Sequence, residues 1–409
     1  MEMAAKTWSG EWWKHGGGGH SWHGFTYDDE LDVLYIGTGN GSPWSHRIRS
    51  SGEGDNLFLC SIVALDPDTG EYLWHYQTTP GESWDYNSSM DIVLADLEIK
   101  GETVKALMHA PKNGFFYVIN RATGKLISAE KFADVNWASH VDIKTGRPVE
   151  LEGARYDKSS AFIMPGPTGA HTWHAMSYSP ITKLVYLPTT HSSIGMDDTE
   201  IPDDYANKAF DWGFGVNFTF TPPIRDYDGS LQAWDPVAQK AEWEIPQKTA
   251  HAAGTLVTSG GIVFQGAPDG VFYAYDAFTG DTVWEYDAGL GISAPAISYK
   301  IDGKQYISLL VGFGGGWANG NSNNSSLGWS YGIHKRRLIT FSLGGDQKIP
   351  DQPPPFYPKP LVEKDFVVKK ELADMGAAVY QRKGCWQCHG YEAPGAVSPY
   401  LPASPLTFS

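Results

Sequence analysis

The sequence predicts an all-β fold, and two observations lead to this prediction. The composition favours short strands and tight turns, since 409 residues include 46 glycines, 26 prolines, 16 tryptophans and 21 tyrosines, with only 19% charged residues. A short pattern also recurs along the chain, as expected of a fold made of repeated units. With 41% hydrophobic residues, the chain is able to bury the cores of two or three domains.

The recurring pattern runs from a small residue through Asp and a Thr-Gly turn to Trp. Complete copies start at Ala64, leading to Trp74, and at Ala274, leading to Trp284. Because Asp and Trp keep the same separation in both, we expect Asp and Thr-Gly to form a hairpin turn, with the Trp packed on a neighbouring unit. Weaker copies lack one or more of these residues and occupy 233–243 and 119–124.

Repetition of such units predicts a β-propeller, in which four-stranded blades close around an axis and leave few exposed edges. Similar turn-then-strand segments at Tyr27 to Tyr35 and at Tyr178 to Tyr186 support the repetition. The alternative is an ordinary β-sandwich in which the tryptophans coincide by chance.

The texture of the sequence changes near Gly344. Prolines crowd residues 351–360, which favours an extended linker, and residues 362–380 have a composition compatible with a helix. We therefore expect a propeller over residues 1–343, a linker over 344–368 and a second domain over 369–409.

The second domain contains the pattern that attaches a c-type haem, Cys385-Trp386-Gln387-Cys388-His389. The thiols of Cys385 and Cys388 are able to add to the haem vinyl groups, and His389 then supplies the proximal ligand of the haem iron. A dithiol redox pair and half of a zinc site are the competing interpretations. No Met or His follows His389, so the second axial ligand is missing from this sequence.

Several function classes are disfavoured by the bulk properties. A formal net charge of −16 without a cluster of Lys and Arg argues against a nucleic-acid surface. The sequence contains no run of about 18 uncharged apolar residues, so no transmembrane segment is predicted. The first residues lack the features of a secretory signal, and Cys60 stands apart from the other two cysteines, so no disulfide framework is expected.

Six segments, in order along nearly the whole chain, closely resemble the pyrroloquinoline-quinone (PQQ) alcohol dehydrogenases. They lie at 12–22, 37–44, 83–86, 111–117, 169–174 and 311–318. The haem motif narrows the resemblance to the quinohaemoproteins, which have an eight-bladed propeller fused to an α-helical cytochrome c domain. The resemblance implies periplasmic oxidation of alcohols to aldehydes or ketones, with electrons passing to haem c and then to a cytochrome, copper protein or quinone.

The resemblance also implies roles for single residues. Asp85 matches the catalytic base and a calcium ligand, and Asn40 matches a further calcium ligand. Lys112 matches the cation that contacts the quinone oxygens, and Trp22 matches the aromatic floor beneath the cofactor. Without the family, Asp85 and Asn40 would be read as turn residues and Lys112 as a surface lysine.

Further cofactor contacts are implied at Trp317 and Ala318, and at His20, which stands where the family usually has Thr. Relatives that use lanthanides have a second Asp two residues after the base, whereas this chain has Asn87 there, which favours Ca²⁺.

The resemblance starts well inside the family's propeller, so we expect the sequence to be incomplete at both ends. A catalytically inactive fragment or an electron-transfer or binding subunit is therefore an alternative. A sugar, sorbose or polyvinyl-alcohol dehydrogenase of the same family is another.

Overall fold

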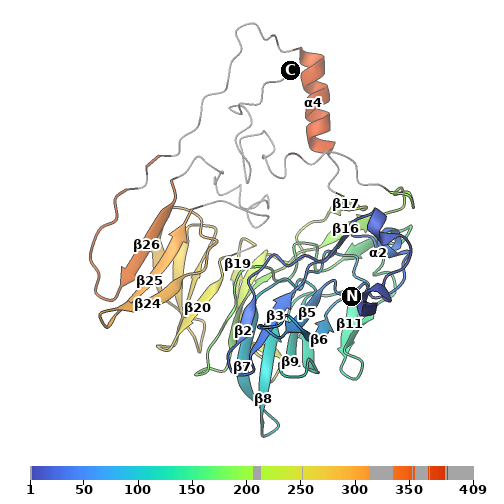
Figure 1. Cartoon of the computed structure of the whole chain (residues 1–409). Helices are drawn as coiled ribbons and strands as arrows, with labels where there is room; N and C mark the ends of the chain where they lie inside the picture. The colour runs from blue at the N-terminus through green and yellow to red at the C-terminus, as the bar shows by residue number, and fades with distance from the viewer. Residues whose placement is uncertain are drawn as a thin grey trace. The chain divides into compact units, whose positions relative to one another are not determined.

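The computed structural model describes residues 2–205, 213–250, 252–312, 335–351, 353–354, 367, 369–382 and 385. The chain divides into two units, Met1–Lys248 and Thr249–Ser409. Most of the described secondary structure is antiparallel β-sheet, which confirms the predicted fold class (Figure 1).

The first unit contains three four-stranded antiparallel sheets, each of which is one blade. In every sheet the neighbouring strands follow one another in space as they do along the chain, apart from inserted segments. The strands of these three blades are Thr26–Asp28 (β2), Val33–Gly37 (β3), Ser61–Leu65 (β5) and Tyr72–Gln77 (β6); Ile92–Ile99 (β7), Glu102–His109 (β8), Phe115–Asn120 (β9) and Leu126–Lys131 (β10); Ser177–Tyr178 (β14), Val185–Thr190 (β15), Gly229–Asp235 (β18) and Lys240–Gln247 (β19).

Smaller elements are inserted between the blade strands and at the start of the chain. One insertion, between β3 and β5, contains β4 and α2. Another, between β15 and β18, contains β16 and β17, and β16 pairs with β13 on one side and with β17 on the other. These elements are Glu2–Ala5 (α1), Trp12–Lys14 (η1), Gly17–Gly18 (β1), Gly41–Ser42 (β4), His46–Ser50 (α2), Ala138–Asp142 (β11), Arg147–Glu150 (β12), Ser160–Ile163 (β13), Ile194–Asp197 (β16) and Asn217–Phe220 (β17).

The predicted hairpin turn recurs with the same hydrogen bonds in four of the described blades, at Asp66, Asn120, Asp235 and Asp276. Oδ1 of Asp66 accepts from the backbone N–H groups of Asp68, at 3.1 Å, and Thr69, at 2.8 Å. Asp276 makes the equivalent turn, and so does Asn120, in the copy that lacks Asp. A side-chain oxygen that accepts from the two following amides is what this turn requires, and Asn supplies one as well as Asp.

The tryptophan of the pattern packs on the next blade, as predicted. Trp74 lies on β6, and its indole ring covers Gly124 in the turn between β9 and β10, where φ is 70°. A Cβ atom at Gly124 would lie 2.5 Å from Cε3 of Trp74, so a side chain there is sterically excluded. The sandwich alternative does not explain this regular contact between successive meanders.

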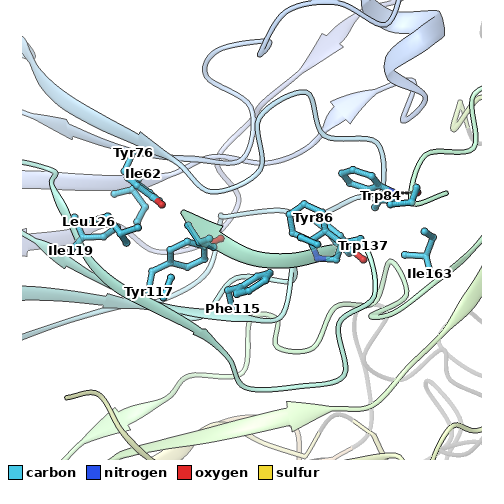
Figure 2. Close-up of a cluster of buried hydrophobic side chains, with 14 of the residues drawn as sticks. Ile62, Tyr76, Trp84, Tyr86, Phe115, Tyr117, Ile119, Leu126, Trp137 and Ile163 are labelled. Carbon is cyan, nitrogen blue, oxygen red and sulfur yellow. Dashed lines mark hydrogen bonds between the residues drawn. The ribbon is translucent and has the colours of Figure 1, made fainter. Parts of the chain in front are cut away.

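The first two blades share an aromatic core (Figure 2). Trp84 and Tyr86 are fully buried, with ring centroids 5.6 Å apart, and Trp137 packs against both of them. Phe115 meets Trp137 edge to face. Buried aromatic side chains of this size contribute strongly to stability, so this cluster fixes the loops that lie next to it.

The second unit continues the same construction. Its described strands are Thr255–Thr258 (β20), Ile262–Gly266 (β21), Val271–Asp276 (β22) and Thr282–Asp287 (β23) in one sheet, and Ile297–Ile301 (β24), Lys304–Val311 (β25) and Arg337–Ser342 (β26) in the next. Trp284 on β23 meets Phe341 on β26 with centroids 5.4 Å apart, so the second complete copy also packs on its neighbour.

One described helix follows these sheets, Lys370–Arg382 (α4). It overlaps the end of the stretch 362–380, for which the sequence predicted helical composition, and ends two residues beyond it. Among the described residues, no helix combines the length and the apolar character needed to cross a bilayer.

Replacement of Gly124 tests the packing between blades. Gly124→Ala is expected to lower the free energy of unfolding by about 2–4 kcal/mol, because it combines an unfavourable φ with a clash against Trp74. Gly70→Ala is the matched control, since Gly70 occupies the same turn with φ 71° and nothing lies within 4 Å of an added Cβ. The free energies of unfolding of both variants, measured in urea, separate the cost of the unfavourable φ from the cost of the clash with Trp74. Equal losses would contradict the role of the Trp74 contact.

Candidate active site

The sequence-predicted site residues of the first unit lie on segments that connect strands. His20 and Trp22 lie between β1 and β2, and Asn40 lies between β3 and β4. Asp85 lies between β6 and β7, and Lys112 between β8 and β9. Loops positioned by rigid sheets are the usual location of binding and catalytic groups.

Asp85 and Lys112 form an ion pair that is largely shielded from water. Nζ of Lys112 lies 2.8 Å from Oδ2 of Asp85, and the two side chains are 11% and 15% exposed, respectively. Lys112 is therefore not a surface lysine. The interpretation of this residue without the family resemblance was wrong.

The stem of Lys112 is held by the segment between β13 and β14. Nζ also donates to the carbonyl of Pro167 at 2.8 Å, and the Lys112 carbonyl accepts from Ala170 N at 3.0 Å. Gly169 has φ 83°, and a Cβ there would lie 2.4 Å from Cγ of Lys112. Glycine at position 169 thus leaves room for the lysine stem. Two acceptors occupy the ammonium, which has a third hydrogen to donate.

Asp85 is positioned by its two neighbours in sequence. Trp84 Nε1 donates to the carbonyl of Ala154 at 3.0 Å, and the Tyr86 hydroxyl donates to the carbonyl of Pro165 at 2.6 Å. Because both rings belong to the buried aromatic core, the loop is anchored on either side of the carboxylate (Figure 2). Burial raises the pKa of Asp85 to about 6, while the positive charge of Lys112 acts in the opposite direction.

Asn87 connects the remaining predicted residues to Asp85. Its Nδ2 donates to Oδ1 of Asp85 at 2.6 Å, and its Oδ1 accepts from Trp22 Nε1 at 3.2 Å and from Asn40 N at 3.0 Å. Asp85, Lys112, Trp22 and Asn40 are therefore brought together. The His20 side chain is exposed, and its carbonyl accepts from Gly39 N at 3.0 Å.

The arrangement is compatible with a flat cofactor and a hard cation. Trp22 is 39% exposed although its Nε1 is tied to Asn87, so one part of a fixed indole is open for stacking. Nδ2 of Asn40 donates to the carbonyl of Gly41, which leaves the amide oxygen to coordinate. Oxygen donors from Asn40 and Asp85 suit Ca²⁺, but two residues supply only part of the six to eight oxygens that it takes.

Glu82 is a further residue of this site that the sequence analysis missed. Its Oε2 accepts from the backbone N–H groups of Trp84 and Asp85, both at 3.0 Å, and of Tyr86 at 3.3 Å. Its Oε1 accepts from Gly41 N at 3.0 Å. The carboxylate therefore ties the Asp85 loop to the Asn40 loop. Its position three residues before Asp85 was the available signal, since acidic side chains often bind the amides that follow them.

Arg49 faces Glu82 in the same buried region. Neither side chain is exposed, and Nη1 of Arg49 lies 4.0 Å from Oε1 of Glu82. Arg49 donates to the carbonyls of Pro43, Trp44 and Glu82 at 2.6–2.9 Å. These hydrogen bonds satisfy a charge that would otherwise be costly to bury.

His46, in α2, contacts the loop that carries Asp85 and is held neutral. Its backbone N donates to Oγ of Ser83 at 3.0 Å, its Nε2 lies 3.1 Å from the Glu53 carbonyl, and Nη1 of Arg155 donates toward its Nδ1 at 3.4 Å. Burial lowers the pKa of His46 to about 4, and the charges of Arg49 and Arg155 act in the same direction.

Four predicted site residues, Trp317, Ala318, Cys388 and His389, lie outside the described residues. Cys385 is described and follows α4, where its backbone N donates to the carbonyl of Tyr380 at 3.0 Å. The described residues contain no group of three or more His, Cys, Asp or Glu side chains arranged to hold a metal ion.

Comparison with known proteins places the chain in a family. The profile described as "Glucose/ethanol/alcohol dehydrogenase, beta-propeller domain", the PQQ family, matches residues 1–139 and 225–307, which is more than half of the chain. The chain belongs to this family of PQQ dehydrogenases, and the blades described above are propeller blades of that kind.

Similar curated proteins are quinohaemoprotein alcohol dehydrogenases. One is "ADH IIB" of Pseudomonas putida, 45% identical over 392 residues, covering 95% of this chain and 56% of that protein. Another, from Comamonas testosteroni, is 46% identical over 361 residues, covering 86% of this chain and 50% of that protein. The chain thus spans about half the length of the curated relatives that it matches.

Solved structures give the same result for the fold. Quinohaemoprotein alcohol dehydrogenase ADHIIG from Pseudomonas putida HK5 matches with a TM-score of 0.87 and 41% identity, covering 99% of this chain and 60% of that one. A europium-containing methanol dehydrogenase matches with a TM-score of 0.68 and 36% identity, covering 75% of this chain and 53% of that one.

Titration of His46 is expected to make the chain less stable as the pH falls. The unfolded chain takes up this proton near pH 6.5, whereas the folded chain resists it until about pH 4, so stability present above pH 6.5 is lost between these values. The slope from this residue is at most about 1.4 kcal/mol per pH unit. His46→Gln should flatten the pH dependence of urea unfolding in this window; an unchanged slope would contradict a neutral His46.

Proposed function

We propose that this chain supplies one part of the active site of a PQQ-dependent alcohol dehydrogenase, in which Asp85 is the base. The observation that carries the proposal is the shielded carboxylate of Asp85, held between Lys112 and Asn87 and close to the exposed indole of Trp22. A buried carboxylate with a raised pKa next to a cation is suited to proton abstraction.

The residues divide the work by charge and shape. Asp85 takes the hydroxyl proton of the alcohol, and its carboxylate is ionised above a pH of about 6. Lys112 stabilises that ionised form at 2.8 Å and uses its remaining hydrogen toward a cofactor oxygen. Trp22 stacks beneath the cofactor plane, and the buried aromatic core keeps the loop from moving as the proton is transferred.

PQQ when bound supplies an acceptor for the hydride of the alcohol carbon, and Ca²⁺ held by Asn40 and Asp85 supplies a Lewis acid. Trp317, Ala318 and His20 are proposed as further cofactor contacts. Asn87 in place of a second Asp favours Ca²⁺ over a lanthanide, since a neutral amide adds no further negative charge for a trivalent ion.

The other half of the proposed function is electron transfer to haem c. The carrier is the motif of Cys385, Cys388 and His389, where the two thiols bind haem covalently and the imidazole ligates its iron. We assign residues 1–343 to the propeller, 344–368 to the linker and 369–409 to a cytochrome c domain. Haem c attachment and the similarity to quinohaemoproteins support a periplasmic location and a downstream electron acceptor.

Removal of the base tests the quinone half. With PQQ and Ca²⁺ added, Asp85→Asn is expected to lower kcat for dye reduction with a primary alcohol by at least about 100-fold, while the bound quinone is retained. Asp66→Asn is the matched control, because Asn120 makes the same turn in the next blade. Turnover that survives in Asp85→Asn would remove Asp85 as the base.

Haem staining of a denaturing gel tests the other half. The chain produced in an oxidising compartment with haem attachment is expected to give a covalent signal. Cys385→Ala should weaken or abolish that signal, because one thioether bond is lost. Cys60→Ala is the control, since Cys60 is fully buried in the propeller and lies far from the haem motif along the chain. A signal lost equally in both variants would contradict the assignment.

A further inference from the structure

The side chain of Asn87 contacts several residues of the candidate active site. The role given to it so far, a preference for Ca²⁺ over a lanthanide, does not account for these contacts. The side chain is buried, with 3% exposure, and all four of its hydrogen-bonding positions are used. Nδ2 donates to the carbonyl of Asp85 at 3.1 Å and to its Oδ1 at 2.6 Å. Oδ1 accepts from Trp22 Nε1 and from Asn40 N.

The direction of these bonds requires an amide. The two partners of Oδ1 are N–H groups that only donate, and the two partners of Nδ2 are oxygens, of which one belongs to a carboxylate. A carboxylate at position 87 would accept from Trp22 but could not donate to an ionised Asp85. A hydroxyl has one hydrogen and so could not donate to both oxygens.

The backbone around Asn87 is shaped to bring these partners within reach. Gly39 has no side chain, and a Cβ there would lie 2.7 Å from Oδ1 of Asn87. The Asn87 carbonyl also accepts from Lys112 N at 3.3 Å. One residue thus contacts the segments that hold the base, the cation, the stacking indole and the amide ligand.

We propose that Asn87 is a positioning residue that sets the orientation of Trp22 and Asp85 together through the two ends of its amide. This inference rests on the proposed function, because it assigns Trp22 to the cofactor and Asp85 to the alcohol. Loss of the amide releases the indole from its Nε1 bond and the carboxylate from its Oδ1 bond at the same time. Quinone binding and turnover are then both affected, because the Asn87 side chain acts through Trp22 and Asp85.

A double-mutant cycle measures the first link. Affinity for PQQ in the presence of Ca²⁺ is titrated for the unmodified chain, Asn87→Ala, Trp22→Phe and the double variant. Asn87→Ala is expected to weaken binding roughly three- to tenfold, the range of one lost hydrogen bond. Because Phe has no N–H, the double variant should bind at least threefold more tightly than the product of the two single effects predicts. Effects that multiply without coupling would overturn the proposal.

The indole N–H of Trp22 provides a readout that needs no cofactor. Its ¹H–¹⁵N resonance is identified by its loss in Trp22→Phe. In Asn87→Ala this resonance is expected to shift and its proton to exchange faster with solvent. Asn87→Asp keeps an acceptor for Nε1, so the resonance should stay protected there while the link to Asp85 is lost. Asn120→Ala is the control, since Asn120 makes several hydrogen bonds in a distant hairpin turn.

The two experiments separate this inference from the proposed function. A chain that binds no PQQ even when unmodified counts against the proposed function, and the indole resonance then decides the role of Asn87 by itself. An indole resonance unchanged in Asn87→Ala, or exposed equally in Asn87→Asp, would overturn the positioning role whether or not PQQ binds.

Discussion

The buried carboxylate of Glu82 is the interaction on which the candidate site depends. One of its oxygens accepts hydrogen bonds from the amides of Trp84, Asp85 and Tyr86, and the other accepts one from the amide of Gly41. Hydrogen bonds to a charged acceptor are about twice as strong as neutral ones, and burial increases the penalty for breaking them. A loop within the first blade and the loop that leads from it to the second blade are thereby held in a single geometry, so the side chains of Asn40 and Asp85 need not be ordered separately.

The blades provide the frame for this geometry through a repeated turn. The side chain of Asp66, Asn120 or Asp276 closes the hairpin, and the following tryptophan packs on the next sheet where the chain completes the pattern. The packing of Trp74 over Gly124 joins the first blade to the second, and that of Trp284 against Phe341 joins the β20–β23 sheet to the β24–β26 sheet. The loops between strands consequently start and end at fixed points of the sheets.

The sequence was sufficient to predict the fold and the family because both leave local signals. The turn residues at 66–70 and 276–280 act on neighbouring backbone groups, so their spacing along the chain reports their structure. Asp85, Lys112, Asn40 and Trp22 were also predicted, but only through the resemblance, since no local rule links residues so far apart. Glu82 and Arg49 were missed because their importance arises from burial, which depends on the packed structure. The contacts of Asn87 were not predicted for the same reason, since its partners come from three separate segments.

The backbone of Asp85 lies in the left-handed region, with φ 65°. Glycine would adopt this conformation without cost, but it has no carboxylate to offer. An Asp there carries a local conformational cost of about 1–2 kcal/mol, which the amide bonds to Glu82 offset. In the proposed function, an alcohol would therefore meet a carboxylate whose orientation has already been selected during folding. The entropic cost of ordering that carboxylate belongs to the folding reaction and would not recur when a reactant binds.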